Sequence, residues 1–295
     1  IYIAPEDKKK DKNAPEEGTA IRLERIDFED CHIKYNDRSA KILVDAKGFN
    51  YIGKGNLSED IFDLSTEAKI DTVDFYYDRT AYLRKKELHA DLITRINTNA
   101  LSFILQKNEL KINKLPLTFT GLFTILRDGY KINIQAASKN AAVKDLLSVM
   151  PPEYLTWMDN TEMSGRSNLL FTFKGNYNVA KKQKPDLAFN LKIDDGAVNY
   201  KDAPVPLTDF QMDVNAIMPS LDTEKLLVNL RTLRFKVGEK DYFNAYFKSR
   251  GLSEMNVDAS IKGALDLATV DAALGLNTID LKGILEKTKY GSSGM

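Results

Sequence analysis

The chain has 295 residues, of which 43% are hydrophobic and 28% are charged, so it is long enough to bury a core as one large domain or two modest ones. Its 42 basic and 42 acidic side chains cancel, which excludes a global electrostatic field that would recruit nucleic acid or an anionic membrane surface. The single cysteine, Cys31, excludes an intramolecular disulfide and a cysteine-rich zinc module.

Residues 1–19 are expected to form a linker or disordered loop. The segment PEDKKKDKNAPEEG mixes charges with proline and glycine and contains almost nothing apolar, so it cannot offset the entropy of ordering. The longest uncharged stretch, from Leu115 to Leu126, has 12 residues, whereas a membrane-spanning helix needs about 18 or more. We therefore expect no transmembrane helix, and a chain that starts at Ile1 without a signal-type segment is typical of an internal fragment.

After the linker, apolar and polar residues alternate with a period of two, as in strands that bury one face only. DLAFNLKI and KINIQAAS show this pattern most clearly, and ELHADLITRI and NVDASIKGAL repeat it. Turn signals such as RDG at Arg127 and DDG at Asp194 separate the segments. The sequence predicts a mainly β, antiparallel fold, with a first stretch of sheet over 20–180 and a second over 181–295 that continues beyond the C-terminus.

Three short helices are expected to interrupt the strands and act as plugs on the sheet. Val143, Leu146, Leu147 and Met150 follow helical spacing, which predicts a helix near 139–150 that ends before two prolines. The second proline can begin another helix near 152–159. The segment LATVDAAL predicts a third helix near 267–274.

No arrangement of residues typical of catalysis or metal binding stands out. His32 adjoins Cys31, but neighbours on a strand point to opposite faces, and His89 stands alone among strand residues. The glycines near Gly53 and Gly165 lack the complete spacing of a phosphate loop or a nucleophile elbow. The sequence therefore predicts a non-enzymatic protein with no catalytic residue, no metal site and no cofactor.

Two acidic doublets, Glu29–Asp30 and Asp194–Asp195, could be read as catalytic carboxylate pairs or as turns. The turn interpretation is favoured because each doublet belongs to a repeated segment. A shift of 165 positions lays Phe28 on Ile193 and Tyr35 on Tyr200. The repeated hairpin is interpreted as a unit that elongates a sheet.

The apolar faces of the strands allow two interpretations. They could pack against a second sheet in an ordinary sandwich, or part of the face could stay open as a groove for an apolar ligand. The candidate groove residues, taken from the segments with the clearest alternation, are Ile132, Ile134, Phe171, Phe173, Leu187, Phe189, Leu191, Ile193, Val257 and Ile261.

The order of several segments resembles the AsmA-like family of bacterial envelope proteins. FTGLFTILRDGYKINIQAASKNAAVKDLLSVMPPEYL resembles the family's pattern of a glycine-led strand, a turn and a strand running into a short helix. MSGRSNLLFTFKGNYN, KPDLAFNLKIDDGAVNYKDAPVPLTDFQMDV and FNAYFKSRGLSEMNVDASIKGALDLATV resemble the segments that follow, so the resemblance covers roughly residues 20 to 285. The richness in lysine, asparagine and tyrosine is typical of Bacteroidetes-type bacteria.

The resemblance implies an elongated, curved antiparallel sheet that forms an apolar trough, related to bridge-like lipid-transfer proteins. It further implies a periplasmic location with an inner-membrane anchor in the parent protein, outside this chain. Expected partners are phospholipid or another acyl lipid and envelope membrane proteins, with a role in outer-membrane biogenesis and phospholipid transport between the two membranes.

Two other functions remain open at this point. A structural or adhesive β-sandwich of the cell surface would bind protein or glycan through loops such as NYKDAPVPL. A carboxylate-dependent glycan hydrolase would need acidic side chains from different strands to converge in a pocket.

Overall fold

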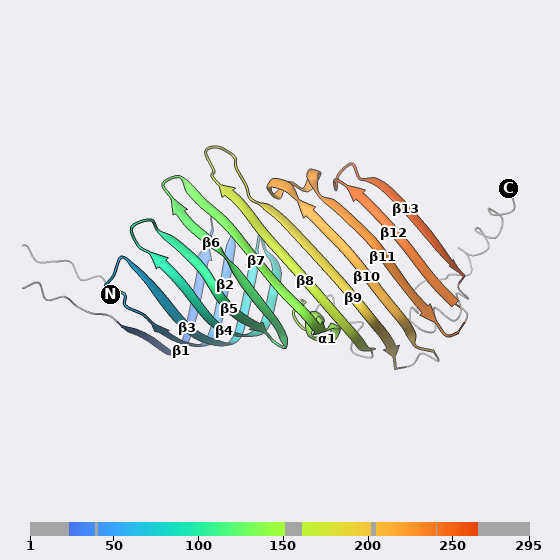
Figure 1. Cartoon of the computed structure of the whole chain (residues 1–295), viewed down its shortest axis with the longest axis horizontal. Helices are drawn as coiled ribbons and strands as arrows, with labels where there is room; N and C mark the ends of the chain where they lie inside the picture. Colours follow the sequence, from blue (N-terminus) through green and yellow to red (C-terminus); the bar gives the residue numbers. More distant parts are fainter. Residues whose placement is uncertain (1–23, 39–40, 151–160, 202–204, 240, 265–295) are drawn as a thin grey trace, which may run out of the picture.

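The computed structural model describes residues 24–38, 41–150, 161–201, 205–239 and 241–264. These residues form one antiparallel sheet of 13 strands whose spatial order is the order of the sequence (Figure 1). The elements are β1 (Arg25–Asp37), β2 (Ile42–Lys54), β3 (Ile61–Tyr77), β4 (Thr80–Asn97), β5 (Ser102–Ile112), β6 (Leu115–Leu126), β7 (Gly129–Ala142), α1 (Val143–Leu147), β8 (Thr161–Tyr177), β9 (Asp186–Tyr200), β10 (Leu207–Met218), η3 (Pro219–Leu221), η4 (Thr223–Lys225), β11 (Leu227–Val237), β12 (Asp241–Arg250) and β13 (Asn256–Ala264). The predicted mainly β, antiparallel fold is confirmed.

Each strand pairs with the next one along the chain, and most of the connections between them are short. The loop between β3 and β4 consists of Asp78 and Arg79, which both have positive φ angles, of 46° and 69°. Positive φ at both central residues is the requirement of the tight turn that matches the twist of a hairpin. The predicted RDG turn at Arg127 is also confirmed, since β6 ends at Leu126 and β7 begins at Gly129.

Cross-strand pairing keeps apolar residues on one face and polar residues on the other. One apolar row crosses six strands through Phe28, Tyr51, Ala68, Ala90, Leu110 and Leu117. The next residues along the same strands form a polar row on the opposite face, which includes Glu67, Asp91 and Glu109. The period of two in the sequence therefore becomes a sheet with one apolar and one polar face.

Bulges bend the long strands β1 and β4 near their middles. Asp30 has a φ of 47° and Lys85 a φ of 51°, and the pairing register shifts beside both residues. A side chain on the neighbouring strand accepts each displaced N–H group: Asn50 Oδ1 lies 3.1 Å from Asp30 N, and Asp74 Oδ1 lies 2.6 Å from Lys85 N. Because bulges bend strands, parts of β1–β4 pass behind β5–β7 in Figure 1.

The bend brings β1 back towards β7. The pKa of the Tyr35 phenol is raised, first by the negative charge of Asp37 and also by the phenol of Tyr130 on β7. In a flat sheet β1 and β7 would be about 29 Å apart, at roughly 4.8 Å per strand, which is too far for such an effect. This effect is consistent with a bend of the first seven strands, and the apolar trough that the resemblance implies stays a prediction.

The repeated segments share a bulge, and neither acidic doublet forms the predicted turn. Asp30 in β1 and Asp195 in β9 are separated by the shift of 165 positions and have φ angles of 47° and 52°. Both doublets lie inside strands, and the DDG sequence at Asp194 does not separate two strands. The turn prediction was wrong because a bulge and a turn require the same residue types, which tolerate positive φ.

The helix predicted near 139–150 is shorter in the structure, where α1 covers only Val143–Leu147. Residues 139–142 belong to β7, because a bulge at Asn140 lets Ala141 and Ala142 continue pairing with β8. Asn168 supports this bulge by accepting the N–H of Asn140 at 3.0 Å. The helices predicted near 152–159 and 267–274 fall outside the residues that the structure describes.

The expected division at residue 180 lies between two paired strands. β8 and β9 pair from Thr161 with Tyr200 to Lys174 with Asp186, so the sheet is continuous across this position.

Candidate functional site

The candidate groove residues all lie on the apolar face of the sheet. Ile134, Phe173 and Leu187 form one cross-strand row, and Ile132 lies beside it on β7. A second row runs from Phe171 and Phe189 through β10, β11 and β12 to Val257 on β13, and a third runs from Ile193 to Ile261. Leu191 lies between these two rows, opposite Leu169 and Val214. The structure thus brings all ten predicted residues onto one surface.

Most of this face is only partly buried. Ile193 is buried with 6% exposure, whereas the other candidates on β7–β9 are half-buried. Towards the last strand exposure rises, to 45% for Val257 and 70% for Ile261. These partly buried aliphatic and aromatic side chains form a shared apolar surface that is partly exposed.

Aromatic rings extend the apolar face across β5–β8, near the edge with the β6–β7 and β8–β9 hairpins. The ring centroids of Phe103 and Phe123 are 6.1 Å apart, those of Phe123 and Tyr130 are 5.5 Å apart, and those of Tyr130 and Tyr177 are 6.2 Å apart. At these distances each ring contacts the next, so the four rings form one row. Sequence reasoning missed this row, although the alternation in KINIQAAS pointed to the same face.

A buried lysine on the apolar face is the second feature that sequence reasoning missed. Lys86 is 5% exposed and donates from Nζ to the carbonyl oxygens of Ser148 (2.9 Å) and Met150 (2.7 Å), just after α1. Asn113 also donates to Ser148 O, at 2.7 Å. These bonds connect the interior of β4 and the turn after β5 to the residues that follow α1, and α1 packs on β7 and β8. They satisfy carbonyl groups that the end of a helix leaves without intrahelical donors.

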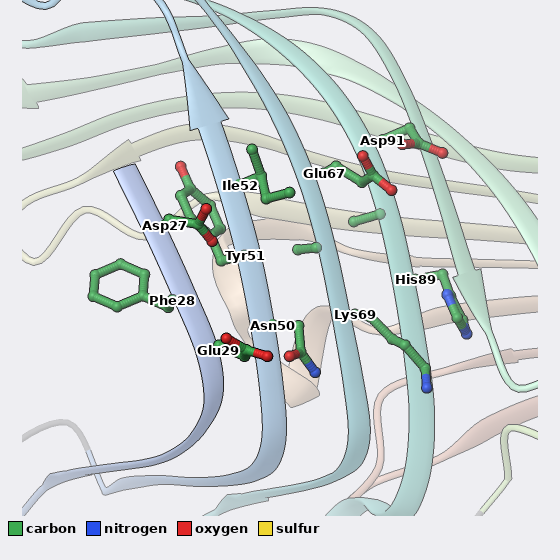
Figure 2. Close-up of a pocket in the computed structure, with 12 residues that line it drawn as sticks. Asp27, Phe28, Glu29, Asn50, Tyr51, Ile52, Glu67, Lys69, His89 and Asp91 are labelled. Atoms are coloured by element: carbon green, nitrogen blue, oxygen red, sulfur yellow. The ribbon is translucent and has the colours of Figure 1, made fainter. Parts of the chain in front are cut away.

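The opposite, polar face carries shallow hollows, and the one over β1–β4 has a volume of about 350 Å³ (Figure 2). Figure 2 shows Glu67 and Asp91 in one row and Lys69 and His89 in the next. Glu67 lies directly opposite Asp91 on the neighbouring strand. Cross-strand like-charge pairs of this kind destabilise a sheet slightly, so the row tolerates this arrangement only because it is solvated.

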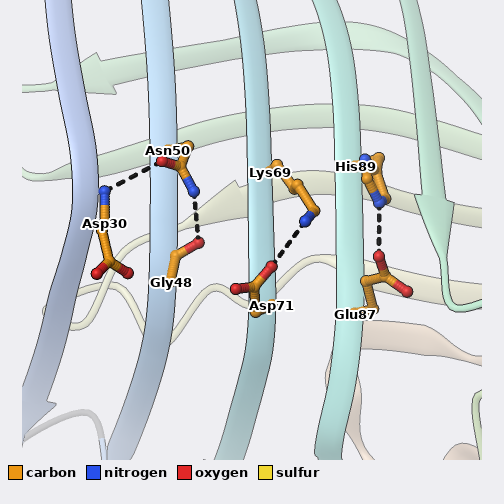
Figure 3. A network of polar contacts seen from close by, with 7 residues as sticks. All are labelled: Asp30, Gly48, Asn50, Lys69, Asp71, Glu87 and His89. Carbon is orange, nitrogen blue, oxygen red and sulfur yellow. Dashed lines mark hydrogen bonds and ion pairs between the residues drawn. The ribbon is translucent and has the colours of Figure 1, made fainter.

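The basic residues of this hollow are engaged with carboxylates of their own strands (Figure 3). Lys69 Nζ lies 2.9 Å from Asp71 Oδ1, and this hydrogen bond is the main cause that raises the pKa of Lys69. His89 Nε2 lies 2.8 Å from Glu87 Oε1. Figure 3 also shows the hydrogen bonds that support the bulge in β1, which join Asn50 to Asp30 and to Gly48. We interpret these contacts as local surface pairs.

Within the described part of the chain, no group of three or more His, Cys, Asp or Glu side chains is arranged to hold a metal ion. His32 bonds Asp45 at 2.8 Å, and Cys31 lies on the other face, among apolar residues, opposite Phe49. Over the same residues no helix combines the length and apolar character needed to cross a membrane.

Comparisons with known proteins give no match for this chain. No protein-family model, no curated protein and no solved structure matches the chain.

Proposed function

We propose that the protein is a non-enzymatic segment of a bacterial envelope protein that carries acyl lipid along the apolar face of its sheet. The single observation that carries this proposal is that successive apolar rows, over β1–β6, β7–β9 and β8–β13, follow one another on a face that stays partly exposed. The proposal includes the AsmA-like identity, the periplasmic location and the role in phospholipid transport and outer-membrane biogenesis, which rest on the sequence resemblance alone.

The physical basis is the transfer of acyl chains out of water. Exposing an acyl chain of about 16 carbons to water costs on the order of 10 kcal/mol, at roughly 0.8 kcal/mol per methylene. An apolar surface that continues across many strands lowers this cost without any chemical step. Among the described residues, Lys86 is the only charged side chain that is buried on this face. Its ammonium group donates hydrogen bonds to two carbonyl oxygens.

A bend of β1–β7 favours a trough and not a flat platform as the shape of the apolar face. An electrostatic effect of Tyr130 on Tyr35, across the five strands between β7 and β1, supports a bend, and we propose that the apolar face lies on its inside. A concave apolar face contacts an acyl chain from more than one side, which removes more of its surface from water than a flat face does.

A surface β-sandwich is the alternative that this geometry favours less. A sandwich needs a second sheet packed face to face on the first. All strands of the described residues belong to one sheet, and their apolar face is partly exposed.

Lipid analysis of the purified 295-residue chain tests the proposal. Native mass spectrometry and extraction with organic solvent should recover phospholipid from the protein expressed in bacteria. The variant F171Q/F189Q, which places two amides in the middle of the apolar face, should retain several-fold less lipid.

The matched control is T172Q/K192Q, which alters the neighbouring positions on the opposite face of the same strands. It should retain as much lipid as the unmodified chain. Absence of lipid from the unmodified chain, or equal loss in both variants, would contradict the proposal.

A further inference from the structure

One edge of the sheet carries a local excess of positive charge on a chain whose total charge is zero. The loop between β8 and β9 contains Lys181, Lys182 and Lys184, and the neighbouring hairpin of β6 and β7 contributes Arg127. In Figure 1 the β8–β9 hairpin stands above its neighbours at the upper edge. We call these two hairpin ends, Leu126–Gly129 and Tyr177–Asp186, the basic edge.

The charges of the basic edge are less neutralised than those of the hairpins beside it. Lys181 and Lys182 form no ion pair with any residue that the structure describes. Lys184 contributes only a minor part to the lowered pKa of Asp222, which Lys225 holds by a hydrogen bond. The β10–β11 hairpin thus neutralises its own lysine, whereas the β8–β9 loop leaves its lysines directed to solvent.

Apolar and aromatic side chains accompany these lysines. Val179, at the tip of the β8–β9 loop, is 73% exposed, and Leu126 of the β6–β7 hairpin is 45% exposed. Tyr130 and Tyr177 end the aromatic row at the same edge, with 41% and 39% exposure. The edge therefore combines lysines, tyrosines and exposed apolar tips, and no described side chain covers these tips.

We propose that the basic edge is a docking surface for an anionic lipid bilayer. Lysines near an anionic membrane surface each add to its attraction, while tyrosine places an apolar ring and a polar hydroxyl at the boundary between headgroups and acyl chains. Val179 and Leu126 would enter the outer part of the acyl region.

An acidic protein or a nucleic acid fits the same residues less well. Either partner would be attracted by the lysines, but a nucleic acid gains little from an exposed valine and leucine, and an acidic protein would need an apolar pocket beside its carboxylates. A bilayer accounts for the charge and for the apolar tips together.

This inference goes beyond the proposed function and does not depend on it. A bilayer at the basic edge would lie beside the aromatic row, where acyl chains could reach the apolar face past Tyr130 and Tyr177. Docking could nevertheless occur without lipid transport, and lipid could be carried by a chain that docks elsewhere.

Vesicle flotation of the full 295-residue chain tests the inference. The chain should bind vesicles of phosphatidylcholine containing about 30% phosphatidylglycerol and should bind pure phosphatidylcholine vesicles much more weakly. The variant K181Q/K182Q/K184Q should bind the anionic vesicles about a hundredfold more weakly, since roughly 1 kcal/mol is lost per lysine.

The matched control removes three positive charges from hairpin ends at the opposite edge, in R79Q/K114Q/K201Q. This variant should bind anionic vesicles like the unmodified chain. Equal weakening in both variants would overturn the proposal, because net charge alone would then explain binding. Failure of the unmodified chain to bind anionic vesicles would overturn it too.

A second variant, V179S, tests the apolar tip without changing charge. It should weaken binding to anionic vesicles several-fold, and unchanged binding would overturn the insertion of this tip. Circular dichroism of each variant confirms that the sheet is folded. Lipid content measured on the same samples separates failure of docking from failure of lipid carriage.

Discussion

The first four strands of the sheet and its last two strands, β12 and β13, differ in length, regularity and burial. β3 and β4 have 17 and 18 residues and shift register at three places in their pairing, whereas β12 and β13 have 10 and 9 residues and pair without any shift. Val73 in β3 is 6% exposed, while Val257 in β13 is 45% exposed. The same alternating pattern therefore gives a more buried apolar face in one region and a more exposed one in the other.

The difference teaches that the burial of the apolar face varies along the sheet although the hydrophobic pattern of the strands does not. Both regions place valine, isoleucine and phenylalanine on the same face. The first region has bulges near the middle of its strands, at Asp30 and Lys85, and each is supported by an Asn or Asp side chain. The pairing of β12 with β13 has no register shift, although β10 and β11 do have such shifts. The predictions below test this contrast.

Loss of the buried ammonium group of Lys86 should have the largest effect. In K86M the methionine retains the apolar stem, but Met150 O loses the only donor identified for it and Ser148 O keeps only Asn113. We expect the free energy of unfolding to fall by about 3 kcal/mol, because the buried, charged donor of two hydrogen bonds is lost. Urea denaturation measures this change.

K248M is the matched control, because Lys248 is exposed on β12. It should change stability by less than about 0.5 kcal/mol. Hydrogen exchange should locate the effect of K86M in β4–β8 and leave β10–β13 protected. Equal effects of the two variants would remove the contrast between the regions.

A valine-to-threonine exchange compares the two apolar faces directly. V73T should reduce the free energy of unfolding by about 1–2 kcal/mol, because the hydroxyl group replaces a methyl group at a buried position. V257T should cost only a few tenths of a kcal/mol, because its side chain already contacts water. Thermal unfolding of both variants is the measurement, and similar values would show that the first region is no more enclosed than the last.

Removing the support of one bulge should have a smaller effect. In N50A the N–H of Asp30 loses its acceptor at 3.1 Å and Gly48 O loses the donor at 3.1 Å, so we expect a loss of about 1 kcal/mol. N244A, on straight β12, should cost a few tenths of a kcal/mol. If N50A were as mild as N244A, the side chain would not be needed to support the bend.

The smallest effect concerns surface carboxylates, which should behave alike in both regions. A hydrogen bond from His32 is the main cause that lowers the pKa of Asp45, and one from Lys236 lowers that of Asp209. A lowered pKa in the folded state contributes stability above the ordinary value of 3.8, and this contribution is lost as the pH falls through the folded pKa.

Carboxyl NMR titration checks this prediction. H32Q should move the pKa of Asp45 back towards 3.8 without affecting Asp209, and K236Q should do the reverse. A shift of both groups in either variant would indicate a long-range coupling that the separate pairs do not explain.

Much of the fold could be predicted because alternation is a local property of the sequence. The period of two indicated the strands, and it identified the shared face of all ten candidate residues from Ile132 to Ile261. The acidic doublets were misassigned as turns because a residue with positive φ is equally suited to a bulge. Lys86 was missed because nothing in its neighbourhood along the chain points to carbonyl oxygens 62 and 64 positions away.

The sequence by itself determined that the chain forms one-sided antiparallel strands, since side chains on a strand alternate between faces whatever the rest of the molecule does. Only the tertiary structure decided how the strands bend, because a bulge depends on the register with a neighbouring strand and on the side chain that accepts its N–H group. The same held for the basic edge. Its three lysines and Val179 are close together in the sequence, but only the pairing of the strands places them beside Arg127 and Tyr130 of the neighbouring hairpin.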